Sequence, residues 1–518
     1  MTQTGPAVLT GRWSSSDPDD RFVVYDPASG EPLRIVQGGG AAQVDAAVRA
    51  ADEAQRAWRR RPARERGRAL AEVAQVLRGH ADELARLETE ENGKPLAQSR
   101  YTDLEACIGA FEFFGGLAGR LPSSCNDLGP IVSIEFLEPY GVVGGILPFN
   151  WPPIHFAAKA APALAVGNTV VLKPGEQAPL TVLRLAELAN QVLPADVLQA
   201  VPGTAAAGAA LAGHPLVRKL SATGSPETGR RVLRAAAEHL TPTLLELGGK
   251  NPLLVFEDAD LDLAAAGVIE GAYFNQGEAC TAASRVLVHE QVHDALVARL
   301  GPAVRRLRVG DGLDPATHVG PLVSARQQRQ VLEWLEIARA EGAVVAAQAP
   351  LPADARLAGG YFVAPTLLTG VGPGSRVARE EIFGPVTCVI PFSDEADAVR
   401  SANSTEFGLV AAVYTTDQAR AMRVARQIEA GVVFVNNYNR NLLGTPFGGT
   451  RSSGYGREHA VATLHEFGYT KAIRLPSGLG EPLAWPAAAE VLDSGPAAGR
   501  STAVGRPSRP GENGKAAT

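Results

Sequence analysis

The sequence predicts an α/β protein in which two open α/β domains follow one another along the chain. The chain has 518 residues, which at about 100–200 residues per domain is enough for several domains. Its 45% apolar and 20% charged residues are typical of a globular protein. The pattern changes near residue 130, after which short apolar runs alternate with helical patterns, as in parallel βαβ units. The alternation repeats from 262 to about 436, so we place the seam between the domains near residue 248.

An N-terminal arm and several helices precede this alternation. Residues 1–40 have an irregular pattern with one strand-like piece at 22–25. Apolar residues at helical spacing then predict three helices, over 41–60, 63–92 and 101–118.

The two domains are defined by the strands and helices that follow. Apolar runs predict first-domain strands at 141–147, 169–172, 198–201, 216–220 and 244–247. Helical patterns between them cover 155–165, 179–193, 204–212 and 226–240. Second-domain strands are predicted at 253–256, 286–289, 386–392, 410–414 and 432–436. Ligands of such sheets usually bind at the carboxyl ends of the strands.

Composition excludes several classes of function. The formal charge of −6 argues against a partner such as nucleic acid or an anionic membrane. No apolar stretch is long enough to span a membrane, and the N-terminal residues do not resemble a secretory signal. The four cysteines lack paired short spacing, which predicts free thiols in a reducing cytoplasm. We expect Cys107, Cys125 and Cys388 to be buried, because a free cysteine usually behaves as a small hydrophobic residue.

Two side chains are candidates for covalent and acid–base chemistry. Cys280 lies in a small, polar, Gly-containing connection before a strand, where a thiol is accessible enough to react. An inert buried thiol is the alternative. Glu246 lies within an apolar strand run, so desolvation should raise its pKa toward neutrality, as suits a general base. The alternative is an edge-strand carboxylate that faces solvent.

Further candidates follow other predicted strands. The Asn150 amide lies among rigid prolines and is able to donate to an oxyanion, although Asn is also a common turn residue. Ser225 is an expected helix N-cap with Pro226 in the first helical position, where backbone amides favour a phosphate. Lys173 and Glu176 are placed to hold ribose hydroxyls, and a carboxylate there repels a 2′-phosphate, which favours NAD over NADP.

One string at residues 289–293 matches the zinc-protease pattern HExxH. That chemistry requires both histidines on one helix, whereas His289 ends a predicted strand. We therefore expect no metal site.

The order and spacing of these signals resemble the aldehyde dehydrogenase superfamily over about residues 10–475. The family's motifs appear as Pro148-Phe149-Asn150-Trp151-Pro152, Lys173-Pro174-Gly175-Glu176, Thr223-Gly224-Ser225, Glu246-Leu247-Gly248-Gly249-Lys250, Gly277 with Cys280, Glu381-Ile382-Phe383-Gly384-Pro385 and Pro446-Phe447-Gly448-Gly449. Two positions depart from the family's pattern. Phe149 stands where Trp is usual, and Ala222 stands where an aromatic residue is frequent. Both changes would weaken binding of a cofactor.

The resemblance implies NAD-dependent oxidation of a small-molecule aldehyde to a carboxylic acid. Cys280 would attack the aldehyde carbon, the Asn150 amide and the Cys280 backbone N–H would hold the oxyanion, and Glu246 would activate the hydrolytic water. Cofactor contacts are implied for Lys173, Glu176, Gly224, Ser225, Phe149, Glu381 and Phe383, with NAD expected and NADP left open.

The resemblance also implies a substrate tunnel. Its lining would be Trp151, His155, Ala279, Thr281 and residues 439–441. Within that loop, Arg440 would favour aldehydes that carry a carboxylate or another polar group. The alternative is that Arg440 faces solvent or a subunit contact.

Domain boundaries and assembly follow from the same resemblance. A Rossmann-like NAD-binding domain would comprise residues 1–120 and 140–247, and a catalytic domain 248–450. Residues 121–139 and 451–475 would form a small β oligomerisation arm. The tail 476–518 has no counterpart in the family, and its composition, dominated by Gly, Pro, Ala, Ser and Arg, predicts disorder. Family members form dimers or tetramers through such an arm, so we expect a homodimer or homotetramer.

Three alternatives to this function stay open. A coenzyme-A-acylating enzyme would transfer the acyl group to a thiol and would not need Glu246 as a base. A cysteine hydrolase would keep Cys280 but need no nicotinamide, and an inactive scaffold would need neither.

Overall fold

The computed structural model describes residues 8–438 and 442–480 and confirms the α/β fold class. Two compact units are distinguished. The larger comprises Met1–Ser123 with Phe136–Lys471, and the smaller comprises Ser124–Glu135 with Ala472–Thr518. The larger unit contains both large sheets and every described candidate site residue.

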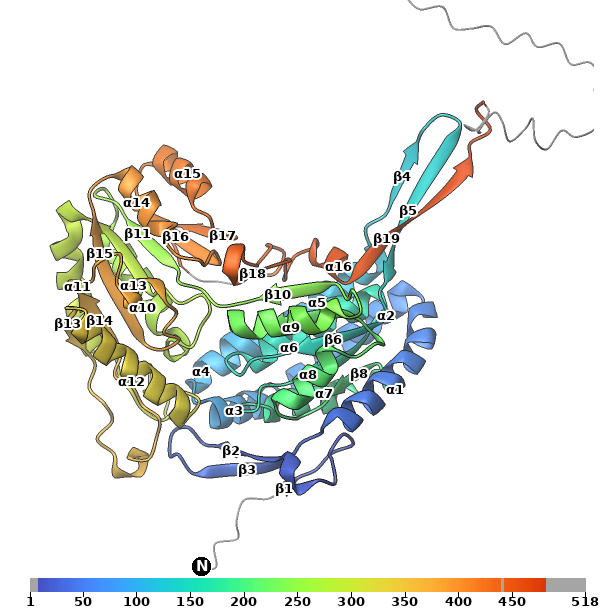
Figure 1. The fold of residues 1–518 in the computed structure, drawn as a ribbon, viewed down its shortest axis with the longest axis horizontal. Helices are drawn as coiled ribbons and strands as arrows, with labels where there is room; N and C mark the ends of the chain where they lie inside the picture. Colours follow the sequence, from blue (N-terminus) through green and yellow to red (C-terminus); the bar gives the residue numbers. More distant parts are fainter. Residues whose placement is uncertain (1–7, 439–441, 481–518) are drawn as a thin grey trace, which may run out of the picture. The chain divides into compact units, whose positions relative to one another are not determined.

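A six-stranded sheet forms the centre of the first domain (Figure 1). Its strands, in spatial order, are β18 (Gly454–Tyr455), β10 (Thr243–Glu246), β9 (Val217–Thr223), β6 (Val142–Ile146), β7 (Thr169–Lys173) and β8 (Leu198–Ala200). All neighbouring pairs are parallel except β18 with β10. The carboxyl ends of β7, β6, β9 and β10 therefore lie along one edge.

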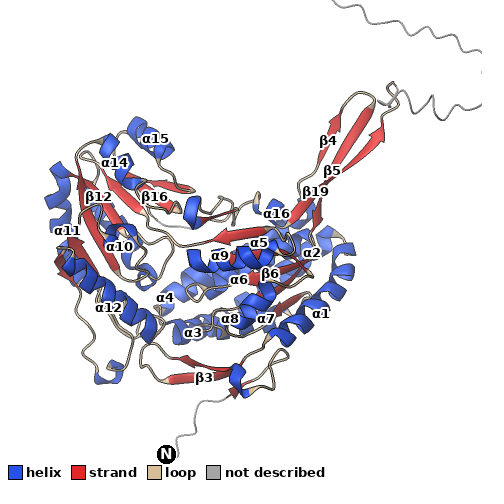
Figure 2. Ribbon diagram, in the orientation of Figure 1, coloured by secondary structure: helices blue, strands red, loops and turns tan. Residues whose placement is uncertain are grey.

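Helices cover both faces of this sheet (Figure 2). Because side chains alternate along a strand, Val143 and Val170 join one hydrophobic cluster, whereas Val142 and Val171 join the other. The first cluster includes residues of α2 (Ala63–Gly79), α3 (Ala81–Asn92), α5 (Leu104–Leu117), α6 (Pro152–Val166) and α7 (Leu180–Ala189). The second includes residues of α1 (Ala41–Arg60), α8 (Ala205–Ala212) and α9 (Pro226–Ala237).

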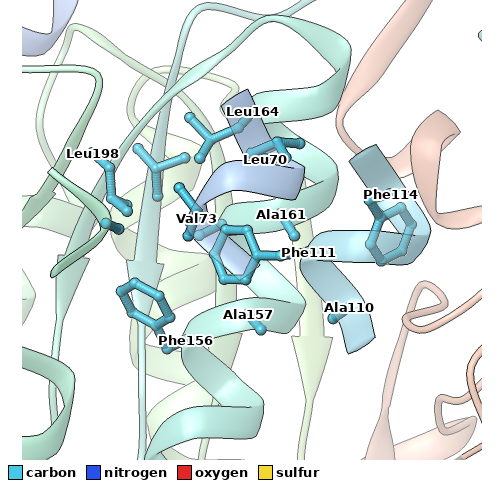
Figure 3. Close-up of a cluster of buried hydrophobic side chains, with 14 of the residues drawn as sticks. Leu70, Val73, Ala110, Phe111, Phe114, Phe156, Ala157, Ala161, Leu164 and Leu198 are labelled. Carbon is cyan, nitrogen blue, oxygen red and sulfur yellow. The ribbon is translucent and has the colours of Figure 1, made fainter. Parts of the chain in front are cut away.

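The first cluster fixes α6, the helix that follows the Asn150 segment. Phe111 of α5 and Phe156 of α6 pack with their ring centroids 5.9 Å apart (Figure 3). Both rings are fully buried, and burying an aromatic side chain stabilises a fold by about 1.5–3 kcal/mol.

A seven-stranded sheet forms the second domain. Its spatial order is β13 (Val344–Gln348), β14 (Thr366–Thr369), β15 (Val386–Phe392), β12 (Arg285–His289), β11 (Pro252–Val255), β16 (Val410–Tyr414) and β17 (Val432–Val435). All neighbours are parallel except β13 with β14. One face packs on α10 (Leu261–Tyr273) and α11 (His293–Arg305), and the other on α12 (Ala325–Ala340), α13 (Arg376–Arg379), α14 (Glu395–Ala402) and α15 (Gln418–Gln427).

Two three-stranded sheets complete the fold. One consists of β1 (Val8–Leu9), β3 (Pro32–Gln37) and β2 (Arg21–Tyr25), and the other of β19 (Gly468–Pro476), β5 (Ile131–Pro139) and β4 (Ser124–Asp127). The second lies almost entirely within the segments that we predicted as the oligomerisation arm, but one part of those segments joins another sheet. We assigned 451–475 to the arm, but Gly454 and Tyr455 extend the six-stranded sheet because they pair with Glu246 and Leu245.

Several local predictions also differ from the structure. The helix predicted over 63–92 is divided at His80, which has a non-helical ψ of 12°. The residue before it is Gly79, and glycine is a poor residue for a helix interior. Helix α6 begins at Pro152, earlier than predicted, because prolines are tolerated in a first turn. Cys125 was expected to be buried, but it is exposed on the four-residue β4. Cys107 and Cys388 are buried as predicted, and all four cysteines are free.

Residues 8–438 and 442–480 contain neither a membrane-spanning helix nor a cluster of metal-ligating side chains. No helix there is long and apolar enough to cross a membrane. No group of three or more His, Cys, Asp or Glu side chains there is arranged to hold a metal ion. The HExxH string is divided as predicted, since His289 ends β12 and His293 begins α11.

Candidate active site

The candidate residues of the first domain lie at one edge of the six-stranded sheet. Asn150 follows β6, Lys173 ends β7, Ser225 follows β9 and Glu246 ends β10. Backbone bonds tie these ends together, because Leu147 N–H donates to the Lys173 carbonyl over 3.0 Å and Gly224 N–H donates to the Glu246 carbonyl over 3.0 Å. The candidate residues of this sheet therefore lie together at its carboxyl edge, where ligands of such sheets usually bind.

The second domain contributes its candidate residues from the opposite ends of its strands. Cys280 precedes β12, and Glu381 and Phe383 precede β15, so these residues lie at amino ends. The carboxyl-end expectation does not extend to this sheet. Its site residues are carried by the loops that enter the strands.

The Asn150 carboxamide is hydrogen-bonded to the segment that carries Cys280. Asn150 is 2% exposed, and its Nδ2 donates to the Glu278 carbonyl over 3.0 Å. The Asn150 carbonyl accepts from Lys94 Nζ over 2.8 Å and from Asn275 Nδ2 over 3.2 Å. Its backbone and its amide are therefore both fixed next to the Cys280 loop.

Glu246 is a buried carboxylate. It is 3% exposed, and neither carboxylate oxygen has a hydrogen-bond partner among the described residues. A Cβ on Gly448, which has a φ of +155°, would lie 2.8 Å from Glu246 Oε1, so the glycine leaves this carboxylate room. Burial raises the pKa of Glu246 well above its usual range, and the charge of Glu458 raises it further, against the opposing cations Lys159 and Arg457. The desolvation predicted from the sequence is confirmed.

Cys280 is half-buried, and its carbonyl accepts from Asn251 Nδ2 over 2.8 Å. Burial raises the pKa of the Cys280 thiol, and the negative charges of Glu381 and Glu246 raise it further. Hydrogen bonding from its own backbone N–H opposes these effects. The resting side chain is therefore a thiol whose ionisation depends on two nearby carboxylates.

Glu381 and the two phenylalanines lie between the domains. Gly249 N–H donates to Glu381 Oε1 over 2.9 Å, and a Cβ on Gly248 would collide with the same carboxylate. Burial raises the pKa of Glu381 to about 7. The rings of Phe149 and Phe383 meet edge to face with centroids 5.9 Å apart.

The remaining cofactor candidates are polar groups with few partners. Lys173 is 7% exposed, burial lowers its pKa, and its Nζ lies 3.8 Å from Glu176 Oε1. Ser225 caps α9 as predicted, since its hydroxyl accepts from Thr228 N–H over 3.2 Å and Pro226 follows it. Ala222 is buried in the hydrophobic cluster that α1, α8 and α9 share with the sheet.

The predicted tunnel residues lie near the thiol as far as the structure describes them. Trp151 and Ala279 form one apolar cluster with Cys280 packed against it. Thr281 is buried, and its carbonyl accepts from Tyr438 Oη over 2.7 Å. His155, which was predicted to line the tunnel, contacts the Asn150 carboxamide, since its Nε2 lies 3.2 Å from Asn150 Oδ1. Arg440 and its neighbours at 439 and 441 lie outside the described residues.

Comparison with known proteins agrees with this arrangement. The model of the aldehyde dehydrogenase family matches residues 13–473 of the chain. The chain belongs to the aldehyde dehydrogenase family. As a member of that family it is an oxidoreductase that acts on aldehydes.

Relatives match nearly the whole aldehyde dehydrogenase chain. It is 50% identical to the aldehyde dehydrogenase citD of Monascus ruber, over 94% of this chain and 97% of that one. The betaine aldehyde dehydrogenase of Mesorhizobium japonicum is 39% identical over 92% and 98%. Betaine aldehyde dehydrogenase from Staphylococcus aureus, solved in complex with NAD+, superposes with a TM-score of 0.87 at 34% identity and covers 90% and 94%.

Sequence reasoning missed a charged group beside Glu246. Lys159 Nζ, fully buried in α6, donates to Glu458 Oε1 over 3.0 Å and to Thr223 Oγ1 over 2.8 Å. Lys159 is the one Lys or Arg in α6, a helix that is otherwise apolar except for His155, and this isolated charge could have indicated a functional role. Its pairing with Glu458 spans 299 residues and had no local signal.

Proposed function

We propose that this aldehyde dehydrogenase uses NAD to oxidise an aldehyde to a free carboxylic acid through a covalent bond to Cys280. The observation that carries this proposal is the Glu246 carboxylate, which is buried, has no hydrogen-bond partner among the described residues, and acts electrostatically on the Cys280 thiol. A base with no structural partner is suited to activating water. This favours hydrolysis over transfer of the acyl group to coenzyme A.

The residues present fit NAD. Lys173 and Glu176 offer a donor and an acceptor to the adenosine ribose, and Gly224 and Ser225 present the α9 N-terminus to a pyrophosphate. Glu381, Phe383 and Phe149 are available to the nicotinamide end, and the Glu381 carboxylate packs against Gly248 at a place that a Cβ would otherwise occupy. When bound, NAD supplies the nicotinamide carbon that accepts a hydride.

Cys280 and Asn150 carry the first half of the proposed reaction. The Cys280 thiol releases its proton to water, and the thiolate attacks the aldehyde carbon. A C–S bond forms, and the carbonyl electron pair moves to oxygen. The Asn150 Nδ2–H and the Cys280 backbone N–H hold that oxyanion. After loss of the hydride from the same carbon, Cys280 holds the acyl group as a thioester.

Glu246 carries the second half. Its carboxylate takes a proton from water while the water oxygen attacks the thioester carbonyl. The C–S bond then breaks, the carboxylic acid leaves, and the Cys280 sulfur regains its electron pair. The substrate carbon meets the apolar cluster of Trp151 and Ala279, which favours an aldehyde with an apolar or aromatic portion near its carbonyl group.

Absorbance of NADH with a panel of aldehydes tests this function. We expect at least one aldehyde among aliphatic, aromatic, amino and carboxylate-bearing compounds to reduce NAD without coenzyme A, and NADP to react more slowly because Glu176 repels its 2′-phosphate. A preference for carboxylate-bearing aldehydes that disappears in Arg440→Ala would support the expectation for Arg440. Turnover only with added coenzyme A would favour the acylating alternative, and release of acid without NAD would favour a hydrolase.

We further propose that the β19-β5-β4 sheet joins chains into a homodimer or homotetramer. Strand β19 lies at the edge of its sheet, and Ile473 and Leu475 on it are 44% and 46% exposed in the single chain. Exposed apolar side chains on an unpaired edge strand are typical of a surface that a partner chain covers. Light scattering of the wild type should give two or four times the chain mass of 54.1 kDa.

The double variant Ile473→Lys with Leu475→Lys should form smaller assemblies. Leu351→Lys, at an exposed leucine outside this sheet, is the matched control and should leave the mass unchanged. A monomeric wild type would contradict the proposal.

A further inference from the structure

His155 lies within hydrogen-bond reach of the amide that the proposed mechanism uses. It belongs to the first turns of α6, five residues after Asn150, and is 6% exposed. Its Nε2 lies 3.2 Å from Asn150 Oδ1. Burial lowers the pKa of His155, and the cation Lys159 one turn later lowers it further, so the ring is neutral near pH 7.

The contacts of Asn150 determine which ring nitrogen carries the hydrogen. A neutral imidazole has one N–H, and an amide oxygen only accepts, so Nε2 of His155 is the donor. On its other side the amide faces the Glu278 carbonyl, which also only accepts and therefore requires Nδ2 of Asn150 there. An amide turned by half a rotation would place Oδ1 against the Glu278 carbonyl and would lose that hydrogen bond.

We propose that His155 is a positioning residue that holds the Asn150 carboxamide by donating from Nε2 to its Oδ1. One Nδ2 hydrogen is then engaged by the Glu278 carbonyl, and the other is kept free for the oxyanion on the substrate. A hydrogen bond accepted at Oδ1 also polarises the amide and makes its N–H a stronger donor. This inference rests on the proposed function, in which Asn150 holds that oxyanion.

The other surroundings of the His155 ring provide packing but no second hydrogen bond among the described residues. The Trp151 ring lies with its centroid 6.4 Å from that of His155, a packing contact that holds the imidazole in place. Nδ1 of His155 has no partner among the described residues. The hydrogen bond to Asn150 is therefore the polar contact on which the ring orientation depends.

Three substitutions of His155 distinguish its hydrogen bond to Asn150 from its contribution to packing. Leucine fills much of the volume of His155 without a donor. Glutamine places an amide nitrogen near the position of Nε2, and asparagine places one near Nδ1, which does not face Asn150. The rate of the first turnover of NADH should fall about tenfold in His155→Leu and His155→Asn, a fraction of the 10²–10³ that a lost oxyanion donor costs. His155→Gln should stay within about threefold of wild type, and the KM for NAD should stay unchanged in all three.

A double-mutant cycle with Asn150→Ala tests whether His155 acts through the Asn150 amide. If His155 acts through the Asn150 amide, His155→Leu should slow the wild type but not the Asn150→Ala variant, because residues that act as a unit are not additive. Equal losses in both backgrounds, or no loss in either, would overturn the proposal. A failure of the proposed function is distinguishable, since the wild type itself would then form no NADH with any aldehyde.

The tautomer gives a readout that does not depend on activity. Nitrogen NMR of histidine-labelled protein should show His155 protonated at Nε2, identified by the signal missing from His155→Gln. Thermal unfolding of each variant checks that it is folded. A ring protonated at Nδ1 would overturn the proposal whether or not a substrate is known.

Discussion

Replacement of Cys280 by alanine should abolish aldehyde oxidation, with a loss of about four to six orders of magnitude in kcat, as found when a covalent nucleophile is removed. Without the sulfur no carbon–sulfur bond forms, and no hydride is released from a covalently held carbon. NADH absorbance measures the loss. Calorimetry should show NAD binding close to that of the wild type, because none of the proposed cofactor contacts is altered.

Cys125→Ala is the matched control for this variant. Cys125 is the exposed free cysteine of β4 and has no part in the proposed chemistry, so its removal should leave turnover unchanged. Substantial activity in Cys280→Ala, or an inactive Cys125→Ala, would show that the nucleophile has been misassigned. Retained NAD binding without any turnover in the wild type would instead favour the inactive scaffold.

The first domain was the more predictable part of the site. The β6, β7, β9 and β10 runs were visible as apolar segments, and parallel strands necessarily bring their carboxyl ends to one edge. Glu246 could be recognised because its neighbours in the strand are apolar, and its burial follows directly. Ser225 and Pro226 could be recognised because capping is a local interaction.

The rest depended on contacts that local sequence does not encode. Cys125 was misjudged because a four-residue edge strand exposes its side chains, and nothing in its neighbours indicates which sheet it joins. Lys159 pairs with Glu458, which lies 299 residues away along the chain, and Asn150 pairs with Glu278, which belongs to the other domain. The link from His155 to Asn150 spans five residues, but it depends on the turn that leads into α6.

The charges of Cys280 and Glu246 are coupled in a way that suits a two-step reaction. An ionised Glu246 raises the pKa of the Cys280 thiol, so the thiolate forms most readily while Glu246 holds its proton. Because electrostatic coupling is reciprocal, a thiolate in turn disfavours ionisation of Glu246. Once the sulfur is acylated it carries no charge, and its repulsion of Glu246 disappears. The carboxylate then ionises more readily, at the stage at which a base is required.

Glu246→Gln should therefore separate the two half-reactions. The first turnover should still release about one NADH per site, because Cys280 and Asn150 are intact. Steady-state turnover should fall by about 10²–10⁴, the usual contribution of a general base. Rapid mixing followed by steady-state absorbance measures both phases, and Glu257→Gln, at a partly exposed carboxylate of the second domain, is the control expected to retain both.

The pH dependence gives this prediction a second test. A base works only when ionised, and burial raises the pKa of Glu246, so steady-state turnover of the wild type should rise from acid toward alkaline pH. Below that pKa the rate should fall about tenfold per pH unit. Glutamine does not titrate, so the residual steady-state rate of Glu246→Gln should lose this dependence. A variant that keeps the wild-type profile, or that loses the first turnover as well, would assign the base to another residue.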